Sequence, residues 1–323
     1  MEQQRGRLSA LYKSHGIGTD EGSIAAAMTL GARQQVSEEL RHDYMVSGSS
    51  HVFALSGMHL SILFMLLSLL LPLMDHPRLC ALVQLSAVWL YVLLVGPHPS
   101  LLRASLMLSI YVALLQTRWK QHGFALLTLS ALLLLACHPQ WLHDVGFQLS
   151  YAALSGILLL FPRLRRLVIH QHEYRYPDSV PTYLRHWLRC ACHWLVDVSL
   201  VGISAQVAVT PLLVYHFHRL SPYAIPSGII VAPLLLLVML LAPLFLVLCL
   251  SAQIMPLVAA AATWCATALS AVVHVMNAFL SWVAHLPHAS VEPLSLSLVR
   301  TILIYLFLLA FLRLLVVRTK SDS

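Results

Sequence analysis

Long apolar runs separated by short polar stretches make up most of the chain after residue 50. Three of these runs, 101–116, 123–137 and 145–161, are shorter than the roughly 20 apolar residues that cross a bilayer. The pattern predicts an all-α, polytopic membrane bundle with about nine hydrophobic segments, giving roughly seven to ten spans. The runs lie at 52–74, 79–96, 101–116, 123–137, 145–161, 195–215, 224–250, 256–285 and 300–317.

The first fifty residues are polar to amphipathic. Val36, Leu40 and Tyr44 recur four residues apart, so they would share one face of a helix. Ser37, followed by two glutamates, is a typical helix start. We therefore expect residues 1–50 to form an N-terminal segment whose short helix lies along the membrane surface.

Three prolines interrupt the run at 224–250, namely Pro226, Pro233 and Pro243. Proline has no backbone N–H, and its ring clashes with the preceding helical turn. We expect this run to be kinked or broken.

Composition excludes a soluble enzyme. Of the 323 residues, 59% are hydrophobic and 10% are charged, with a mean hydropathy of +0.78. A soluble domain carries about 25% charged residues, and a chain this apolar could not cover its own surface with polar groups. Disordered, collagenous and disulfide-rich classes do not fit either. We expect one membrane domain over 51–318 and a polar tail at 319–323.

The chain has 20 lysines and arginines against 13 aspartates and glutamates, which gives a net charge of +7. The positive residues are unevenly distributed along it. If all nine runs span the membrane, the connection at 162–194 and the C-terminus lie on the more positive side, and the N-terminus lies opposite. The positive-inside rule then makes 162–194 a basic cytoplasmic loop. Its arginines are Arg163, Arg165, Arg166, Arg175, Arg185 and Arg189.

Several polar side chains lie within or at the edges of the apolar runs. Most can be explained as hydrogen bonds between helices, which are worth about 0.6 kcal/mol each. Arg103 is different because its guanidinium has five N–H donors to satisfy, and a basic group there would suit a passing phosphate. The set comprises Ser56, His59, Arg103, Asp144, Gln148, Ser150, Asp197, Gln206, His216 and His274.

Five strings resemble, in the right order, the ComEC family of competence proteins. Residues 48–60, GSSHVFALSGMHL, are similar to the family signature G-x-S-H-x-L-A-x-S-G-x-H. The resemblance covers roughly 22–318, with one departure at Ser227, where the family usually has Asn. The other strings lie at 25–48, 96–107 (GPHPSLLRASLM), 138–157 (containing FQLS) and 204–223.

The resemblance implies a channel for single-stranded DNA in the cytoplasmic (inner) membrane, without cofactor, metal or catalysis of its own. Full-length relatives carry an OB-like domain and a metallo-β-lactamase-like domain. Neither is recognisable here, and no H-x-H-x-D-H string occurs, so we expect the membrane module alone. By motif position, the expected channel lining is Ser56, Gly57, His59, Arg103, Gln148, Ser150 and Gln206.

The resemblance also implies partners. The chain has no G-x-x-x-x-G-K-[ST] phosphate loop. We therefore expect a separate cytoplasmic motor, together with DNA-receptor proteins, and a homodimer is one way to complete the pore.

Four other interpretations remain open. The chain could be a transporter for ions or small molecules, or a non-functional remnant of a longer competence protein. Ser56 and His59 could form a nucleophile and base, although a base usually comes from another element. The His and Cys residues of 162–194 could bind a metal, although the C-x-C spacing of Cys190 and Cys192 is not that of a zinc knuckle.

Overall fold

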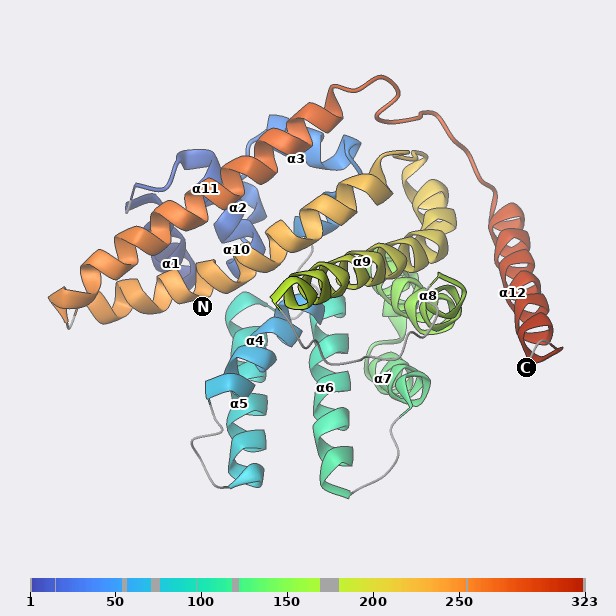
Figure 1. Ribbon diagram of the computed structural model, residues 1–323, viewed down its shortest axis with the longest axis horizontal. Helices are drawn as coiled ribbons and strands as arrows, with labels where there is room; N and C mark the ends of the chain where they lie inside the picture. The colour runs from blue at the N-terminus through green and yellow to red at the C-terminus, as the bar shows by residue number, and fades with distance from the viewer. Residues whose placement is uncertain are drawn as a thin grey trace.

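The computed structural model describes residues 2–14, 16–53, 57–70, 76–96, 98–117, 122–168, 180–253 and 255–321, and these residues are largely α-helical. An isolated bridge between Leu220 and Val291 is the one β pairing among them. Short 3-10 turns, including η1 (Arg33–Gln35), join several helices. The α-helices of Figure 1 are α1 (Glu2–Ser14), α2 (Thr19–Leu30), α3 (Glu38–Val46), α4 (Gly57–Leu70), α5 (Pro77–Val95), α6 (Pro99–Thr117), α7 (Gly123–Cys137), α8 (Val145–Val168), α9 (Val180–Phe217), α10 (Ala224–Ala252), α11 (Ala259–Ala284) and α12 (Leu298–Ser321).

Each of the nine apolar runs forms one helix, from α4 to α12. Five segments are long and apolar enough to cross a membrane, and they lie in α5, α8, α9, α10 and α11. Four shorter apolar segments lie in α4, α6, α7 and α12. The predicted all-α membrane bundle is therefore confirmed. Helix α7 has 15 residues, so at about 1.5 Å per residue it is shorter than a hydrocarbon core of about 30 Å.

The proline-rich run is not broken. Helix α10 is continuous over Ala224–Ala252, although Pro233 and Pro243 lie inside it. Tyr12 of α1 donates a hydrogen bond from its hydroxyl to the carbonyl of Ala242, at 3.2 Å. This bond ties α1 to α10 beside Pro243, while the carbonyl that loses its helical partner to Pro243 is that of Met239, one turn earlier.

The N-terminal segment forms three helices rather than one and is part of the core, while the position of its predicted helix along the membrane surface stays a prediction. Helices α1 and α2 pack with α10 and α11, and every residue of 22–30 in α2 is buried. Helix α3 does begin after Ser37, whose Oγ accepts from the N–H of Leu40. However, Tyr44 of α3 is fully buried and donates to Asn277 Oδ1 of α11, at 2.6 Å. The alanine-rich α2 is too short to resemble a span, yet its small side chains allow close helix packing.

The basic connection at 162–194 is mostly helical rather than a loop. Helix α8 continues to Val168 and α9 begins at Val180, while 169–179 lie outside the described residues. Arg165 of α8 forms an ion pair with Asp197 of α9, with Nε and Oδ1 2.7 Å apart. Arginine is a good helix former, so a charged stretch can prolong an apolar helix beyond the membrane. The cytoplasmic placement of this segment stays a prediction.

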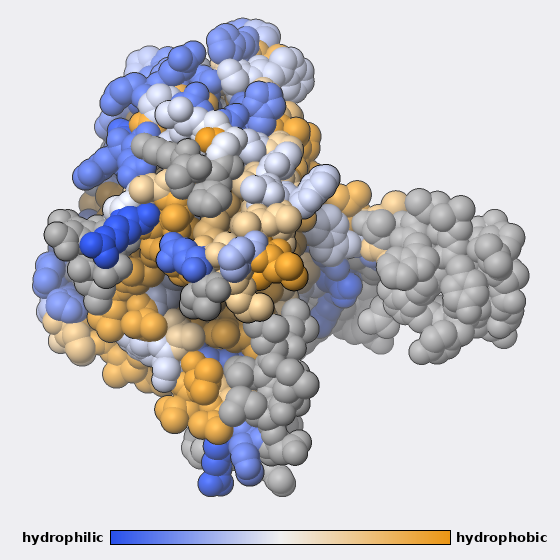
Figure 2. Space-filling model, turned by 90° about the vertical axis from the view of Figure 1, so that its left-hand side faces the viewer, coloured by the Kyte–Doolittle hydropathy of each residue, from blue (hydrophilic) through white to orange (hydrophobic). Residues whose placement is uncertain are grey.

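The helices are not all parallel. Figure 1 shows α5 and α6 side by side, the long pair α10 and α11 crossing above them, α9 running obliquely below α10, and α7 and α8 seen nearly along their axes. Helix α12 follows an extended connection and meets α9, where the Tyr305 hydroxyl donates to the carbonyl of Ala208 at 2.7 Å. Large apolar side chains are exposed along α5, α10, α11 and α12, and Figure 2 shows apolar surface over much of one face. Exposed apolar surface on this scale suits contact with lipid.

Candidate functional site: a polar junction between α4, α6 and α8

Arg103 lies one turn into α6, on its buried side, and only 8% of its surface is exposed. Its Nη1 donates to the backbone carbonyl of Ser150 on α8, at 2.9 Å. Its Cζ lies 5.6 Å from the ring centre of Tyr151, which is within the range of a cation–π interaction. Its Nε has no hydrogen-bond partner among the described residues. A buried arginine among apolar helices is costly and usually marks a functional site.

Gly57 begins α4 directly beside this guanidinium. A Cβ at Gly57 would lie 3.1 Å from the Cβ of Ala104 and 3.6 Å from Nη2 of Arg103. Glycine therefore allows the α4 backbone to approach Arg103 closely. His59, two residues on, is also buried, with 5% of its surface exposed. Ser56, the first predicted lining residue, lies outside the described residues.

Tyr151 extends the junction to α7. Its hydroxyl shares a hydrogen bond with Oγ of Ser130, at 3.0 Å, and Ser130 is fully buried. Four helices thus meet around Arg103. Neither Tyr151 nor Ser130 was predicted from the sequence as a site residue, although Tyr151 directly follows Ser150 at the end of the FQLS string.

Gln148 and Ser150 lie on opposite sides of α8, because residues two apart in a helix are rotated by about 200°. The carbonyl of Ser150 accepts from Arg103, whereas Gln148 Nε2 donates to the carbonyl of Leu142 at 2.8 Å. Gln148 Oε1 lies 2.8 Å from Nε2 of His216, and an amide oxygen only accepts, so His216 donates. Gln148 therefore belongs to a second polar group, which joins α8 to the end of α9.

Gln206 belongs to neither group in the part of the chain that the structure describes. Its Nε2 donates to Oγ1 of Thr210, one turn along α9, at 3.4 Å. The buried side of α9 instead faces Gly156 of α8, where an added Cβ would lie 2.4 Å from the Cβ of Ala208. A lining role for Gln206 stays a prediction.

The first and last of the resembling strings meet in space at Gly48. Its φ is +77°, and an added Cβ would lie 2.5 Å from the Cβ of Ala224 and 3.1 Å from that of Ser221. Both the left-handed backbone and the close approach require glycine here. The signature that opens the membrane domain is thereby fixed against the start of α10.

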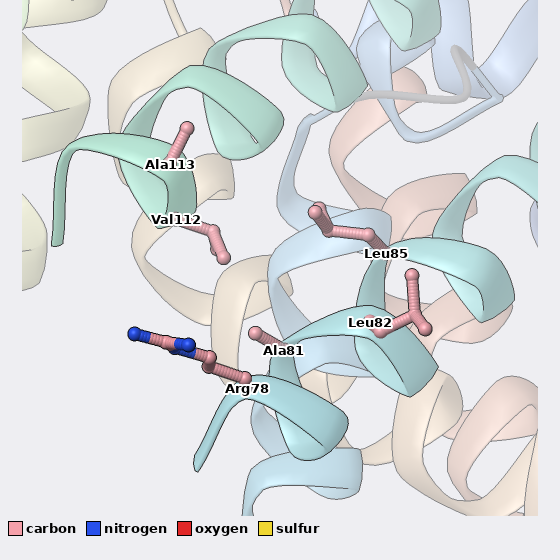
Figure 3. Close-up of a pocket in the computed structure, with 6 residues that line it drawn as sticks. All are labelled: Arg78, Ala81, Leu82, Leu85, Val112 and Ala113. Atoms are coloured by element: carbon pink, nitrogen blue, oxygen red, sulfur yellow. The ribbon is translucent and has the colours of Figure 1, made fainter. Parts of the chain in front are cut away.

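A shallow groove between α5 and α6 has a different character from the Arg103 junction. Its volume is about 220 Å³, and apart from one arginine its lining is apolar (Figure 3). Such a lining suits a lipid chain better than a polyanion. The lining residues are Arg78, Ala81, Leu82, Leu85, Val112 and Ala113.

Two alternatives from the sequence remain hypotheses. Among the described residues, no group of three or more His, Cys, Asp or Glu could hold a metal. However, His170, His172 and Glu173 of the 162–194 segment lie outside those residues. The same holds for Ser56, so the structure says nothing about its pairing with His59 as a nucleophile and base.

The fold and this junction define a polytopic helical membrane protein whose polar groups meet between helices. The family model described as "Competence protein" matches residues 28–318, so the chain belongs to the competence protein family. This confirms the family resemblance seen in the sequence.

Two relatives show how much of a longer protein the match covers. ComE operon protein 3 of Bacillus subtilis (strain 168) is 28% identical over 215 residues, which is 66% of this chain and 25% of that protein. An uncharacterized protein of Aquifex aeolicus (strain VF5) is 28% identical over 140 residues, or 43% of this chain and 33% of that protein. The match thus spans a quarter to a third of these relatives. No solved structure matches the chain.

Proposed function

We propose that this chain forms a channel that passes transforming DNA, as a single strand, across the cytoplasmic membrane. Membership of the competence family and the similarity to a ComE operon protein support a role in DNA uptake. The bilayer core excludes a polyanion, so passage requires a continuous polar path with basic groups along it.

The buried guanidinium of Arg103 is the observation that carries this proposal. It is held by one neutral carbonyl and one aromatic ring, without a carboxylate partner among the described residues. A phosphate oxygen makes a stronger, charge-assisted hydrogen bond with arginine than a carbonyl does. The seam between α6 and α8 is closed around Arg103. A strand would enter when the guanidinium exchanges the Ser150 carbonyl for a phosphate.

The other predicted lining residues and partners belong to the same proposal. Gly57 leaves room beside Arg103, and the buried His59 follows it on α4. Ser150 would take part through its backbone carbonyl, which holds Arg103, and Ser56, Gln148 and Gln206 would add polar groups further along the path. A separate motor would pull the strand, receptor proteins would deliver it, and a second copy would complete the pore if one chain does not enclose it.

A transformation assay tests the proposal. The gene is deleted from a strain shown to be competent, marked DNA is added, and both transformants and nuclease-protected DNA outside the cytoplasm are counted. We expect deletion to abolish transformation while protected DNA accumulates, and residues 1–323 to restore it. An Arg103→Ala variant should lose roughly tenfold or more, because a hydrogen bond to a charged group contributes about 1.5–3 kcal/mol.

The matched control is Arg300→Ala, which removes an exposed arginine from α12. It should transform like the wild type at equal membrane abundance. Unchanged transformation after deletion would contradict the proposal and favour a remnant or a transporter of small molecules. Full activity of folded Arg103→Ala would remove Arg103 from the path.

A further inference from the structure

Arg5, Arg33 and His98 converge where α2 and α5 end and α6 begins. Arg5 reaches from α1 to both ends, donating from Nη1 to the carbonyl of Val95 at 3.1 Å and from Nη2 to that of Gly31 at 3.4 Å. Arg33 follows Gly31 by two residues in η1, and His98 lies in the turn after Val95.

Two hydrogen bonds to backbone carbonyls fix the position of the Arg5 guanidinium, and they leave other N–H donors of that group available. The last carbonyls of a helix lack partners within the helix and attract a cation, which explains the two bonds of Arg5. These bonds use two of its N–H donors, and a guanidinium has five. Arg33 is exposed, and its side chain forms no hydrogen bond or ion pair among the described residues.

Further contacts hold η1, which carries Arg33, against α1 and α3. Gln35 of η1 donates from Nε2 to Oγ of Ser9 on α1, at 3.1 Å. Arg41 of α3 donates from Nη2 to the carbonyl of Arg33, at 2.6 Å, and so adds a third guanidinium. Arg41 also lies 3.8 Å from Glu38, in an exposed ion pair that stabilises little.

Among the described residues, the one carboxylate paired with a cation of this group is Glu38, which lies 3.8 Å from Arg41. Neither Arg5 nor Arg33 forms an ion pair there. Partial burial, then Arg33 and then Arg5 lower the pKa of His98, so at neutral pH its imidazole offers a neutral hydrogen-bond donor rather than a further positive charge. Two guanidinium groups held near one another, neither with a carboxylate partner of its own, are typical of an anion site.

We propose that Arg5, Arg33 and His98 form a binding site for a phosphodiester group, and that its occupant is an incoming nucleic-acid strand. The polar surroundings favour a strand over a lipid headgroup. Residues 33–35 and 37–39 are all exposed and polar, whereas a bound lipid needs apolar surface for its chains.

The site also lies on the way to Arg103. Four residues of α6 separate His98 from Arg103, and five steps along the helix give a rise of about 7 Å. The inference therefore deepens the proposed function and rests on it for the identity of the strand. A phosphate held at the start of α6 would hand the strand to the buried arginine one turn deeper.

Direct binding tests the site. The full chain is purified in detergent, and its affinity for a labelled single-stranded oligonucleotide is measured by fluorescence anisotropy over a range of salt concentrations. We expect Arg33→Ala and His98→Gln each to weaken binding several-fold. Arg33→Ala should also reduce the salt slope by about 0.7, the value for one lost phosphate contact on a single strand. Arg5→Ala should weaken binding further if it folds.

Arg7→Ala is the matched control, because Arg7 is an exposed arginine two residues further along α1 and faces the other side of that helix. It should bind like the wild type. Folding is checked by the melting temperature, and the exposed Arg33 keeps the test informative if Arg5→Ala unfolds. Equal affinity of wild type and folded Arg33→Ala, or an equal loss in Arg7→Ala, would overturn the site.

A second experiment, with lipid, distinguishes a nucleic-acid phosphate from a lipid phosphate as the ligand. The same variants are placed in nanodiscs of phosphatidylcholine with or without phosphatidylglycerol, and retained lipid is measured by mass spectrometry. If the variants lose phosphatidylglycerol but bind oligonucleotide normally, the site is a lipid site and the proposal fails. The transformation assay is scored separately, so failure of the channel and failure of this site are distinguishable.

Discussion

Arg103 is bound through the backbone carbonyl of Ser150, not through its hydroxyl. No substitution at Ser150 that keeps α8 intact removes that acceptor. The nearby hydroxyl that does form a hydrogen bond between helices belongs to Tyr151, with Ser130. At position 150 the acting group is thus the backbone carbonyl, which any residue type would supply, and not the serine side chain.

This distinction predicts different outcomes for two small substitutions. Ser150→Ala should leave the melting temperature and DNA uptake close to wild type. Tyr151→Phe should lower the free energy of unfolding by about 1 kcal/mol, the net value of one hydrogen bond. Thermal unfolding in detergent and the transformation assay measure both effects. A strong loss of uptake in folded Ser150→Ala would contradict this assignment and support a lining role for the hydroxyl.

At the scale of residues, the sequence identifies the junction but not its geometry. Gly57, Arg103 and Ser150 come from three separate strings and do meet. Gln148 was expected in the same lining, yet it turns toward His216. A string of letters shows neither which helix face each residue occupies nor where the neighbouring helix lies, so Gln148 and Ser150 could not be separated before the packing was known.

Helices α8 and α9 pack closely where Gly156 of α8, which has no side chain, meets the backbone of α9. An added Cβ at Gly156 would lie 2.4 Å from the Cβ of Ala208 and 2.5 Å from the carbonyl oxygen of Ser204. Small residues at such crossings let two backbones pack directly. Gly202 of α9, by contrast, has nothing within 4 Å of its added Cβ.

These two glycines provide a matched pair of variants. Gly156→Ala should destabilise the protein by about 1–3 kcal/mol, the usual effect of overpacking. Gly202→Ala should be neutral or stabilise by up to about 1 kcal/mol, because alanine is the better helix former. Melting temperatures of the purified variants measure the difference. Equal effects of the two substitutions would show that α8 and α9 do not cross at Gly156.

At the scale of elements, long helices were predictable and short buried ones were not. Nine apolar runs correspond to α4–α12 because hydropathy averages over many residues. Helix α2 was missed because its apolar stretch is short and begins next to Asp20 and Glu21. Its burial depends on α10 and α11, which lie more than 190 residues later in the chain. The local sequence around α2 therefore does not indicate that distant helices will bury it.

At the scale of the whole molecule, an apolar exterior encloses a small number of polar contacts. Arg165, near the end of α8, pairs with the partly exposed Asp197 of α9, and Arg103 is the buried exception among the described arginines. That arrangement suits a membrane protein that handles a charged substrate through its interior rather than at an open pocket. The class of protein followed from composition alone, whereas the location of its polar interior required the packing of four helices.

The most direct measurement of the central claim is transfer of a strand through the purified protein. The chain is reconstituted into liposomes, a potassium gradient makes the interior positive, and single-stranded oligonucleotide is added outside. After external nuclease digestion, internal DNA is quantified by amplification. We expect protected single-stranded DNA with the wild-type chain, much less with Arg103→Ala, and none with double-stranded DNA of the same sequence. Protein-containing liposomes that admit small ions but take up no more DNA than empty liposomes would contradict a DNA channel.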